Sequence, residues 1–290
     1  MNSVNSERKY IGLLGYPLGH SFSPDMQNAA FRNRNVNYVY KLIEVKPADF
    51  PSVAKALPSM DYEGFNVTIP YKVEIIRYLD EIDEAAKCIG AVNTVVIKDG
   101  KLKGYNTDGI GFLRSLEESM GSGVEGKNIF VLGSGGASRA ICMISALNKA
   151  RKIFICNRTF EKAIALAEDI NKYVPESSIA LPMECDEMSK TIRNADVFIN
   201  TTSVGTFPKV DEIPIDSSLL NKKLIVYDVI YNPQKTKLLL EAEKLGCKTI
   251  SGLGMLVYQG AEAFELWTGK KAPADLMFDV LSEVLRKKEH

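Results

Sequence analysis

The residues best suited to chemistry in this sequence are a lysine and an aspartate that each follow a short strand-like run. Lys72 follows GFNVTIPY, and Asp108 follows GYNT. We place Lys72 in the first turn of a helix predicted over Pro70–Leu79, where the positive end of the helix dipole disfavours a cation. A lysine held there beside a carboxylate forms a couple suited to moving a proton. Taken singly, each residue retains a plainer interpretation: Lys72 as a solvated side chain and Asp108 as a helix cap.

Hydroxyl and amide side chains follow neighbouring strand-like runs. Ser21 and Ser23 are two residues apart in a stretch predicted to be extended, just before a helix. Two hydroxyls and a helix N-terminus suit a small carboxylate, although Ser23 alone is equally suited to capping that helix. Asn93 and Asn106 are amides at predicted strand ends, where open α/β sheets bind ligands. They are able to bond ring hydroxyls.

A glycine-rich turn predicts a nucleotide site. The stretch NIFVLGSGGASRA (128–140) joins an apolar, β-branched run to a helical pattern through Gly133, Gly135 and Gly136. Such a turn directs backbone N–H groups and a helix N-terminus at a pyrophosphate. Ser138 stands where the third glycine of the usual dinucleotide pattern would be. A tight turn without a ligand is the plainer alternative.

The end of the next strand favours NADP. The run KIFICN (152–157) ends in Asn157 and is followed by Arg158 and Thr159, with no acid to bind a ribose 2′-hydroxyl. The guanidinium of Arg158 matches phosphate geometry, and the two neighbours add neutral donors. Thr159 is also a good helix N-cap. An NADP turn together with a Lys–Asp couple predicts hydride transfer to a carbonyl carbon, without a metal.

Composition excludes several other classes. The formal net charge is zero, which argues against nucleic acid or an anionic membrane surface as a partner. No apolar run reaches membrane-spanning length, and the polar opening MNSVNSERKY lacks the core of a signal peptide. The five cysteines are scattered with no CxxC pair, as expected of reduced thiols in a cytoplasmic protein. The chain has two histidines, His20 and the terminal His290; a zinc site or a serine–histidine triad would have to use His20, and nothing else in the sequence supports either.

The order of predicted elements indicates an α/β fold with two units. The first contains strands over 10–15, 38–45, 64–68, 92–97 and 101–105, and helices over 24–34, 50–57, 70–79 and 109–120. Glycine-rich GSGVEG (121–126) marks a boundary. The second alternates strands at 128–132, 152–157, 196–201, 224–228 and 248–250 with helices at 137–148, 160–172 and 236–245, a doubly wound pattern. Helices over 255–267 and 274–287 follow, and the pattern does not assign them to either unit.

Taken together, these motifs resemble those of the shikimate dehydrogenase family. The matching stretches run in order from Gly15 to Gly269: GYPLGHSFSP, FNVTIPYK, GAVNT, GYNTDG, GSGGASRA, NRT, NTTSVG, YDVIYNPQKT and GLGMLVYQGAEAFELWTG. The resemblance implies NADPH-dependent, reversible reduction of 3-dehydroshikimate to shikimate, a step toward chorismate and the aromatic amino acids. It implies a substrate domain over 1–108 and 254–290, to which the last helices return, and a Rossmann NADP domain over 109–253.

The resemblance also assigns site residues. It implies Lys72 and Asp108 as the catalytic pair. Substrate contacts are implied for Ser21, Ser23, Thr68, Lys72, Asn93, Asp108 and Gln259, with Tyr231 closing over the substrate. Cofactor contacts are implied for Gly133, Ser134, Gly135, Gly136, Ala137, Asn157, Arg158, Thr159, Thr202, Val229, Gly252 and Met255.

Two positions depart from the family pattern, and several alternatives stay open. Thr206 stands where Met is common and Ser251 where Asp is common, both beside the expected nicotinamide region. The nearest alternative is a quinate/shikimate dehydrogenase that uses NAD or both cofactors. A catalytically silent metabolite-sensing regulator is a second class, disfavoured because the Lys–Asp pair is intact. A methylenetetrahydrofolate dehydrogenase shares the two-domain plan, but GHSFSP and YNTDG do not point to folate. The sequence does not decide between a monomer and a homodimer.

Overall fold

The computed structural model describes residues 8–19, 21–183 and 185–288 of the chain. The two histidines considered above, His20 and His290, lie outside these ranges. The chain divides into two compact units. Unit 1 comprises the described residues up to Thr107 together with Val257–Lys288, and unit 2 comprises Asp108–Leu256.

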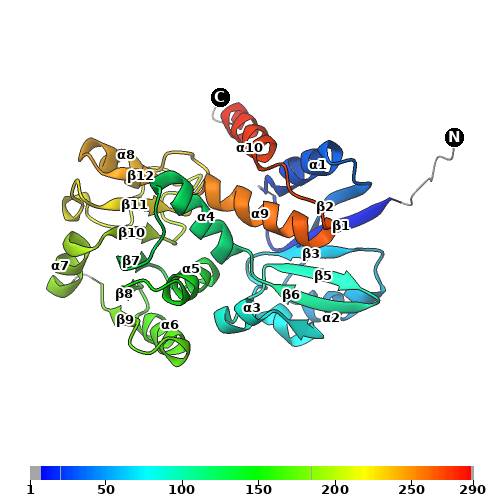
Figure 1. Cartoon of the computed structure of the whole chain (residues 1–290), viewed down its shortest axis with the longest axis horizontal. Coiled ribbons are helices and arrows are strands. Elements are labelled where there is room, and N and C mark those ends of the chain that lie inside the picture. The colour runs from blue at the N-terminus through cyan, green and yellow to red at the C-terminus, as the bar shows by residue number, and fades with distance from the viewer. Residues whose placement is uncertain (1–7, 20, 184, 289–290) are drawn as a thin grey trace. The chain divides into compact units, whose positions relative to one another are not determined.

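Unit 1 is built on a mixed six-stranded sheet of order β2-β1-β3-β5-β6-β4 (Figure 1). The strands are β1 (Lys9–Gly15), β2 (Tyr38–Glu44), β3 (Gly64–Val67), β4 (Glu81–Ile82), β5 (Thr94–Lys98) and β6 (Lys101–Tyr105). β1 pairs in parallel with both β2 and β3, whereas β5 is antiparallel to β3 and to β6. The ends of β1 and β3 therefore meet at one edge of the sheet.

Helices cover both faces of this sheet. They are α1 (Ser23–Asn33), α2 (Phe50–Ala56), α3 (Glu84–Ile89), most of α9 (Leu253–Thr268) and α10 (Ala274–Lys288), with short 3₁₀ turns η1 (Leu57–Ser59) and η2 (Glu74–Tyr78). The indole Nε1 of Trp267 in α9 donates to the carbonyl of Val95 at 3.0 Å, and Gly64 lies against the same ring. α10 packs on α1. The expected return of the last two helices to the first unit is thus confirmed.

Unit 2 is a parallel sheet of order β12-β11-β10-β7-β8-β9. Its strands are β7 (Asn128–Leu132), β8 (Lys152–Cys156), β9 (Ser178–Leu181), β10 (Val197–Asn200), β11 (Ile225–Asp228) and β12 (Lys248–Ile250). Counted from β7, this order is 3-2-1-4-5-6, the arrangement of dinucleotide-binding Rossmann folds. The predicted doubly wound sheet is confirmed. Ligands bind such sheets beyond the carboxyl ends of the strands, near β7 and β10 where the order reverses.

The helices of unit 2 lie on both faces of its sheet (Figure 1). They are α4 (Asp108–Met120), α5 (Gly136–Leu147), α6 (Phe160–Tyr173), α7 (Asp186–Asn194) and α8 (Lys237–Lys244), with the 3₁₀ turn η3 (Ser217–Leu219). The Tyr227 hydroxyl of β11 donates to Ser115 Oγ of α4 at 3.0 Å, and its ring meets Phe112 edge-on. α4 therefore belongs to unit 2, and the boundary predicted at residues 121–126 is wrong. Those glycines serve a turn within unit 2.

Each unit has its own apolar core. In unit 1, Phe50 stacks on Tyr71 with ring centroids 3.9 Å apart, and both side chains are fully buried. In unit 2, Phe130 and Phe198 stack between the sheet and the α7–α8 face. Among the residues that the structure describes, none of the helices is both long and apolar enough to cross a bilayer.

The helix predicted over Pro70–Leu79 is wrong. Only Glu74–Tyr78 form a 3₁₀ turn, and residues 70–73 form tight turns, the first closed by the Tyr71 N–H donating to the Thr68 carbonyl. Burial of the Tyr71 ring against Phe50 outweighs the weak helix preference of this β-branched stretch. Lys72 is therefore not in the first turn of an α-helix, and the dipole argument made for it does not apply.

Candidate active site

Asn93, directly before β5, is the centre of a buried polar cluster in unit 1. Its Oδ1 accepts from the Thr107 N–H at 2.8 Å, and its Nδ2 donates to Thr107 Oγ1 at 3.0 Å. The side chains of both residues are almost fully buried. This two-point contact fixes the chain at Thr107, and the next residue is Asp108. One carboxyl of the predicted catalytic pair thus follows a rigid anchor.

Gln259 of α9 lies beside Asn93, with a separation of 3.5 Å between its Oε1 and Asn93 Nδ2. The fully buried Gln27 of α1 donates through Nε2 to the carbonyl of the next residue, Gly260, at 2.8 Å. A side chain at Gly260 would collide with Met26, so α1 and α9 approach closely here. Gln27 was not among the predicted site residues. Gln27 stands four residues after Ser23 and so lies on the same face of α1; this spacing is the one sequence feature that could have indicated a place near the site.

The backbone of Lys72 lies next to the same cluster. Its carbonyl accepts from the Val92 N–H at 2.7 Å, and Asn106 Nδ2 donates to the Ala91 carbonyl at 2.9 Å. Lys72 and the residues that precede Asp108 are thus both tied to the segment 91–93. Lys72 is half-buried.

The serine segment differs from the prediction. Phe22 has φ −93° and ψ 0°, and Ser23 opens α1, so Ser21 and Ser23 do not lie in an extended stretch. Phe22 occupies the N-cap position and Ser23 is the first helical residue, so Ser23 does not have the capping role considered for it. Ser21 Oγ accepts from the Ser23 N–H at 3.3 Å. Both serines and Thr68 are half-buried.

A chain of hydrogen bonds links Tyr40 of β2 to Asn93. The Tyr40 hydroxyl donates to Asn66 Oδ1 at 2.7 Å. Asn66 Nδ2 in turn donates to the Asn93 carbonyl at 3.1 Å. Burial raises the pKa of Tyr40, so its phenol stays protonated and able to donate. The sequence analysis did not predict Tyr40 as a site residue, because a tyrosine in an apolar strand is usually a core residue. Asn66 was included in the motif FNVTIPYK but was given no role.

The glycine turn after β7 has the geometry of an anion cradle. Gly133 has φ +116°, and its N–H donates to the Cys156 carbonyl at 2.8 Å. The buried Ser138 hydroxyl donates back to the Gly133 carbonyl at 2.7 Å and closes the turn. No side chain caps α5 at Gly135, and its first turn carries no acid. The free space around Gly135 and the N-terminal N–H groups of α5 fit a pyrophosphate.

The end of β8 fits a 2′-phosphate. Asn157 Nδ2 donates to the Thr159 carbonyl at 2.9 Å, which shapes the turn into α6. Arg158 and Thr159 are exposed. Thr159 occupies the N-cap position of α6 but makes no side-chain capping bond, so capping does not account for its hydroxyl. This donor set contains no acid, which agrees with NADP rather than NAD.

The remaining residues expected to contact the cofactor follow β10, β11 and β12, and Tyr231, expected to close over the substrate, follows β11. Thr202 Oγ1 donates to Asn200 Oδ1 at 2.7 Å. The Gly252 N–H donates to the Ile230 carbonyl at 3.0 Å, and a side chain at Gly252 would collide with the Val229 carbonyl. Only glycine allows this close approach. Met255 is buried in α9, and Tyr231 is half-buried with a pKa raised by burial.

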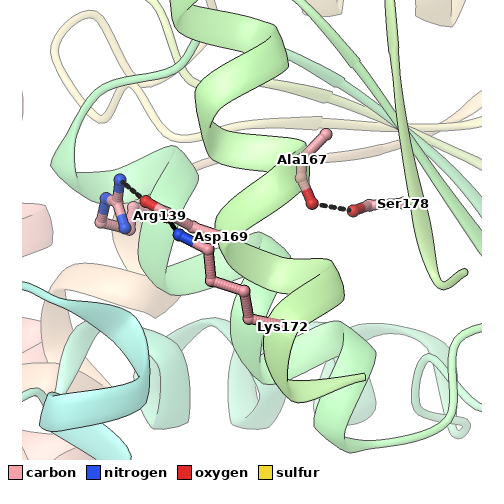
Figure 2. Close-up of polar contacts among 5 residues, drawn as sticks. All are labelled: Arg139, Ala167, Asp169, Lys172 and Ser178. Atoms are coloured by element: carbon pink, nitrogen blue, oxygen red, sulfur yellow. Dashed lines mark hydrogen bonds and ion pairs between the residues drawn. The ribbon is translucent and has the colours of Figure 1, made fainter. Parts of the chain in front are cut away.

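An ion-pair cluster braces the helices behind the glycine turn. Figure 2 shows Asp169 of α6 between Arg139 of α5 and Lys172, with both N–O distances 2.8 Å. Burial opposes ionisation of Asp169, but hydrogen bonds from Lys172 and Arg139 outweigh it and hold its pKa below the ordinary value. Ser178 Oγ of β9 also donates to the Ala167 carbonyl of α6 at 3.0 Å. These bonds fix α6 against its neighbours.

Family models match most of the chain. Residues 13–95 match the shikimate dehydrogenase substrate binding domain, 115–228 match shikimate / quinate 5-dehydrogenase, and 252–281 match the shikimate 5′-dehydrogenase C-terminal domain. A curated shikimate dehydrogenase (NADP(+)) of Methanopyrus kandleri is 44% identical over 285 residues, which is 98% of each chain. This chain belongs to the shikimate dehydrogenase family.

Solved structures of the shikimate dehydrogenase family agree with this fold. A shikimate dehydrogenase in complex with NADP+ has a TM-score of 0.90 and 44% identity, over 97% of each chain. Shikimate 5-dehydrogenase from Listeria monocytogenes, in complex with shikimate and NAD, has a TM-score of 0.88 and 39% identity over 97% of this chain and 99% of that one. Both support the α/β two-unit fold predicted from the sequence.

Proposed function

We propose that this chain is an NADP-dependent shikimate dehydrogenase, which reversibly reduces 3-dehydroshikimate to shikimate, a step toward chorismate and the aromatic amino acids. The observation that carries the proposal is the buried Asn93–Thr107 contact, because it anchors the residues preceding Asp108 beside the backbone neighbours of Lys72. Relatives that share about 45% of their residues with this chain over nearly its full length carry the same name.

We propose that residues 1–108 and 254–290 form the substrate domain and residues 109–253 the NADP domain. The contact of Gln259 with Asn93 and the bond of Gln27 to Gly260 support the assignment of α9 to the substrate side. The glycine turn and the acid-free end of β8 support the nucleotide assignment of the other unit.

In the proposed mechanism Lys72 and Asp108 hold and move one proton at the ketone oxygen of the substrate. The ammonium of Lys72 donates the proton as the oxygen gains charge, and the carboxylate of Asp108 orients that ammonium and accepts a hydrogen bond from a ring hydroxyl. When bound, NADPH supplies the hydride that reduces the carbonyl carbon. The oxidation of shikimate uses the same pair in the opposite sense.

The remaining residues bind and orient. We assign the substrate carboxylate to Ser21, Ser23 and Thr68, and the ring hydroxyls to Asn93 and Gln259. The buried link from Tyr40 through Asn66 to the Asn93 carbonyl supports the second assignment, since it holds the Asn93 backbone in place. Tyr231 is assigned to close over the ring.

The nucleotide contacts divide among three places. The turn that includes Ser134 and Ala137 takes the pyrophosphate, and the Asn157–Thr159 segment takes the adenosine 2′-phosphate. Thr202, Val229, Gly252 and Met255 are assigned to the nicotinamide half. We keep a cytoplasmic location as the expected one, because all five cysteines are free thiols.

One assay tests this function: initial rates with shikimate and with quinate, each with NADP and with NAD. We expect kcat/KM to be highest for shikimate with NADP. A preference for quinate or for NAD would favour a quinate/shikimate dehydrogenase, and no turnover with any pair, despite measurable binding of shikimate, would favour a metabolite-sensing regulator.

A further inference from the structure

Asp228 is a buried carboxylate that is not among the residues assigned to catalysis, substrate binding or cofactor binding. It is the last residue of β11, and its side chain is fully buried. A buried carboxylate lowers stability unless donors surround it. Within the described part of the chain no ion pair involves it, and the donors that reach it are neutral.

Three elements of unit 2 supply these donors. Asn200 Nδ2, at the end of β10, and the backbone N–H of Ile230 both donate to Asp228 Oδ1 at 3.1 Å. Thr236 Oγ1 donates to Oδ2 at 2.7 Å. Thr236 is also the N-cap of α8 and accepts from the Leu239 N–H at 3.4 Å. One side chain therefore joins the ends of two central strands to the start of a helix.

The network continues into the loop after β10. Asn200 Oδ1 accepts from both the N–H and the hydroxyl of Thr202, at 3.1 and 2.7 Å. Thr202 Oγ1 then accepts from the Val204 N–H at 3.2 Å. Asp228 fixes the Asn200 amide, and the amide fixes the orientation of Thr202. Thr202 is one of the residues assigned to the cofactor.

The loop after β11 is held in the same way. Asp228 binds the Ile230 N–H, and the Ile230 carbonyl accepts from the Gly252 N–H at 3.0 Å. Thr206 Oγ1, the departure from the family's common methionine, donates to the Asn232 carbonyl at 3.1 Å and so joins the two loops. These hydrogen bonds therefore restrict the backbone conformation of residues 229–231.

We propose that Asp228 is a positioning residue that sets the two loops assigned to the nicotinamide half of the cofactor, while the adenosine half binds independently of it. This inference rests on the proposed function. Burial raises the pKa of Asp228 to about 6, and the three donors account for an ionised carboxylate at neutral pH. The pyrophosphate turn and the 2′-phosphate residues follow β7 and β8 and make none of these bonds.

The test compares Asp228→Asn with a matched control, Asp196→Asn. Asp196 accepts from the Asn128 N–H at 2.7 Å at the opposite, amino-terminal edge of the same sheet. Dissociation constants are measured for NADPH and for 2′-phospho-ADP-ribose, which lacks the nicotinamide, and kcat is measured with shikimate and NADP.

For Asp228→Asn we expect NADPH affinity and kcat each to fall about tenfold, the loss expected for weakening charge-assisted bonds. We expect 2′-phospho-ADP-ribose to bind as in the wild type, and the control to match the wild type for both nucleotides. An equal loss for both nucleotides would show a merely structural role, and no loss for either would also overturn the proposal.

If Asp228→Asn does not fold, Thr236→Val and Thr236→Ser replace it. Valine removes the donor to Asp228 and serine retains it, so only valine should weaken NADPH selectively; equal behaviour of the two would contradict the proposal. The nucleotide measurements need no turnover. A wild type that binds NADPH but does not oxidise shikimate would refute the proposed function and leave the test of Asp228 intact.

Discussion

Two glycines of the turn after β7 should respond differently to substitution by alanine. At Gly133 we expect a loss of stability, and at Gly135 a loss of NADPH affinity. Gly135 has φ −81°, and an added Cβ would meet no atom within 4 Å. Gly133 has φ +116°, and its added Cβ would collide with Thr201 Oγ1, which donates to the Leu132 carbonyl at 2.7 Å. Alanine should therefore fit at Gly135 and strain the fold at Gly133.

The magnitudes follow from this geometry. At Gly133 the left-handed backbone costs about 1–2 kcal/mol for an alanine, and disturbing the Thr201 hydrogen bond costs about 1 kcal/mol more. For a unit of this size, we expect Tm to fall by roughly 5–10 °C. At Gly135 stability should change by less than about 0.5 kcal/mol. Its methyl group would occupy the space proposed for the pyrophosphate, and we expect NADPH affinity to fall by about tenfold or more, or about 1.4 kcal/mol.

The assay is thermal unfolding without nucleotide, followed by titration of NADPH into each folded variant. Gly100→Ala is the control, because Gly100 has φ +75° with no atom near its added Cβ. It should lower Tm modestly and leave NADPH affinity unchanged. If Gly135→Ala bound NADPH as tightly as the wild type, the pyrophosphate would not lie above this turn and the cradle assignment would be refuted.

Three further predictions concern other parts of the chain. Arg158→Ala should weaken NADP by at least tenfold and NAD by less than twofold in KM, because NAD lacks the 2′-phosphate; equal losses would remove Arg158 from cofactor selection. Trp267→Phe should lower the free energy of unfolding by about 1–3 kcal/mol in urea titrations followed by circular dichroism, since the bond to the Val95 carbonyl is lost; an unchanged midpoint would contradict this. Asp228 has a folded pKa of about 6, raised above its unfolded value, so its contribution to stability is present at low pH and lost as pH rises through 6. Asp228→Asn should therefore gain stability relative to the wild type between pH 4 and pH 7, by on the order of 3 kcal/mol, and a pH-independent difference would refute the shift.

Much of unit 2 could be predicted because its signals are local. The apolar runs at Asn128–Leu132 and Lys152–Asn157, separated by a glycine turn and a helical pattern, admit few other arrangements. Strand β9 and helix α7 were missed. β9 has only four residues. In α7 (DEMSKTIRN), Met188 and Ile192 do lie four residues apart on one helix face, but two apolar positions among nine residues are a short signal.

The site of unit 1 was less predictable because its contacts join distant residues. Lys72 was placed in the first turn of a helix predicted over Pro70–Leu79, but the buried ring of Tyr71 determines the local backbone. The Tyr40–Asn66–Asn93 chain joins β2, β3 and the residue before β5, which are far apart in sequence, and no spacing rule detects it. Gln259 entered the site only through a family resemblance.

The most direct test of the central claim is the kcat of Lys72→Ala together with its dissociation constant for shikimate. Removing the proton donor should lower kcat by about 100- to 10,000-fold while shikimate binding changes much less. Lys98→Ala, an exposed lysine at the end of β5, should match the wild type in both measurements. A kcat for Lys72→Ala within a few-fold of the wild type would exclude Lys72 from proton transfer and contradict the mechanism.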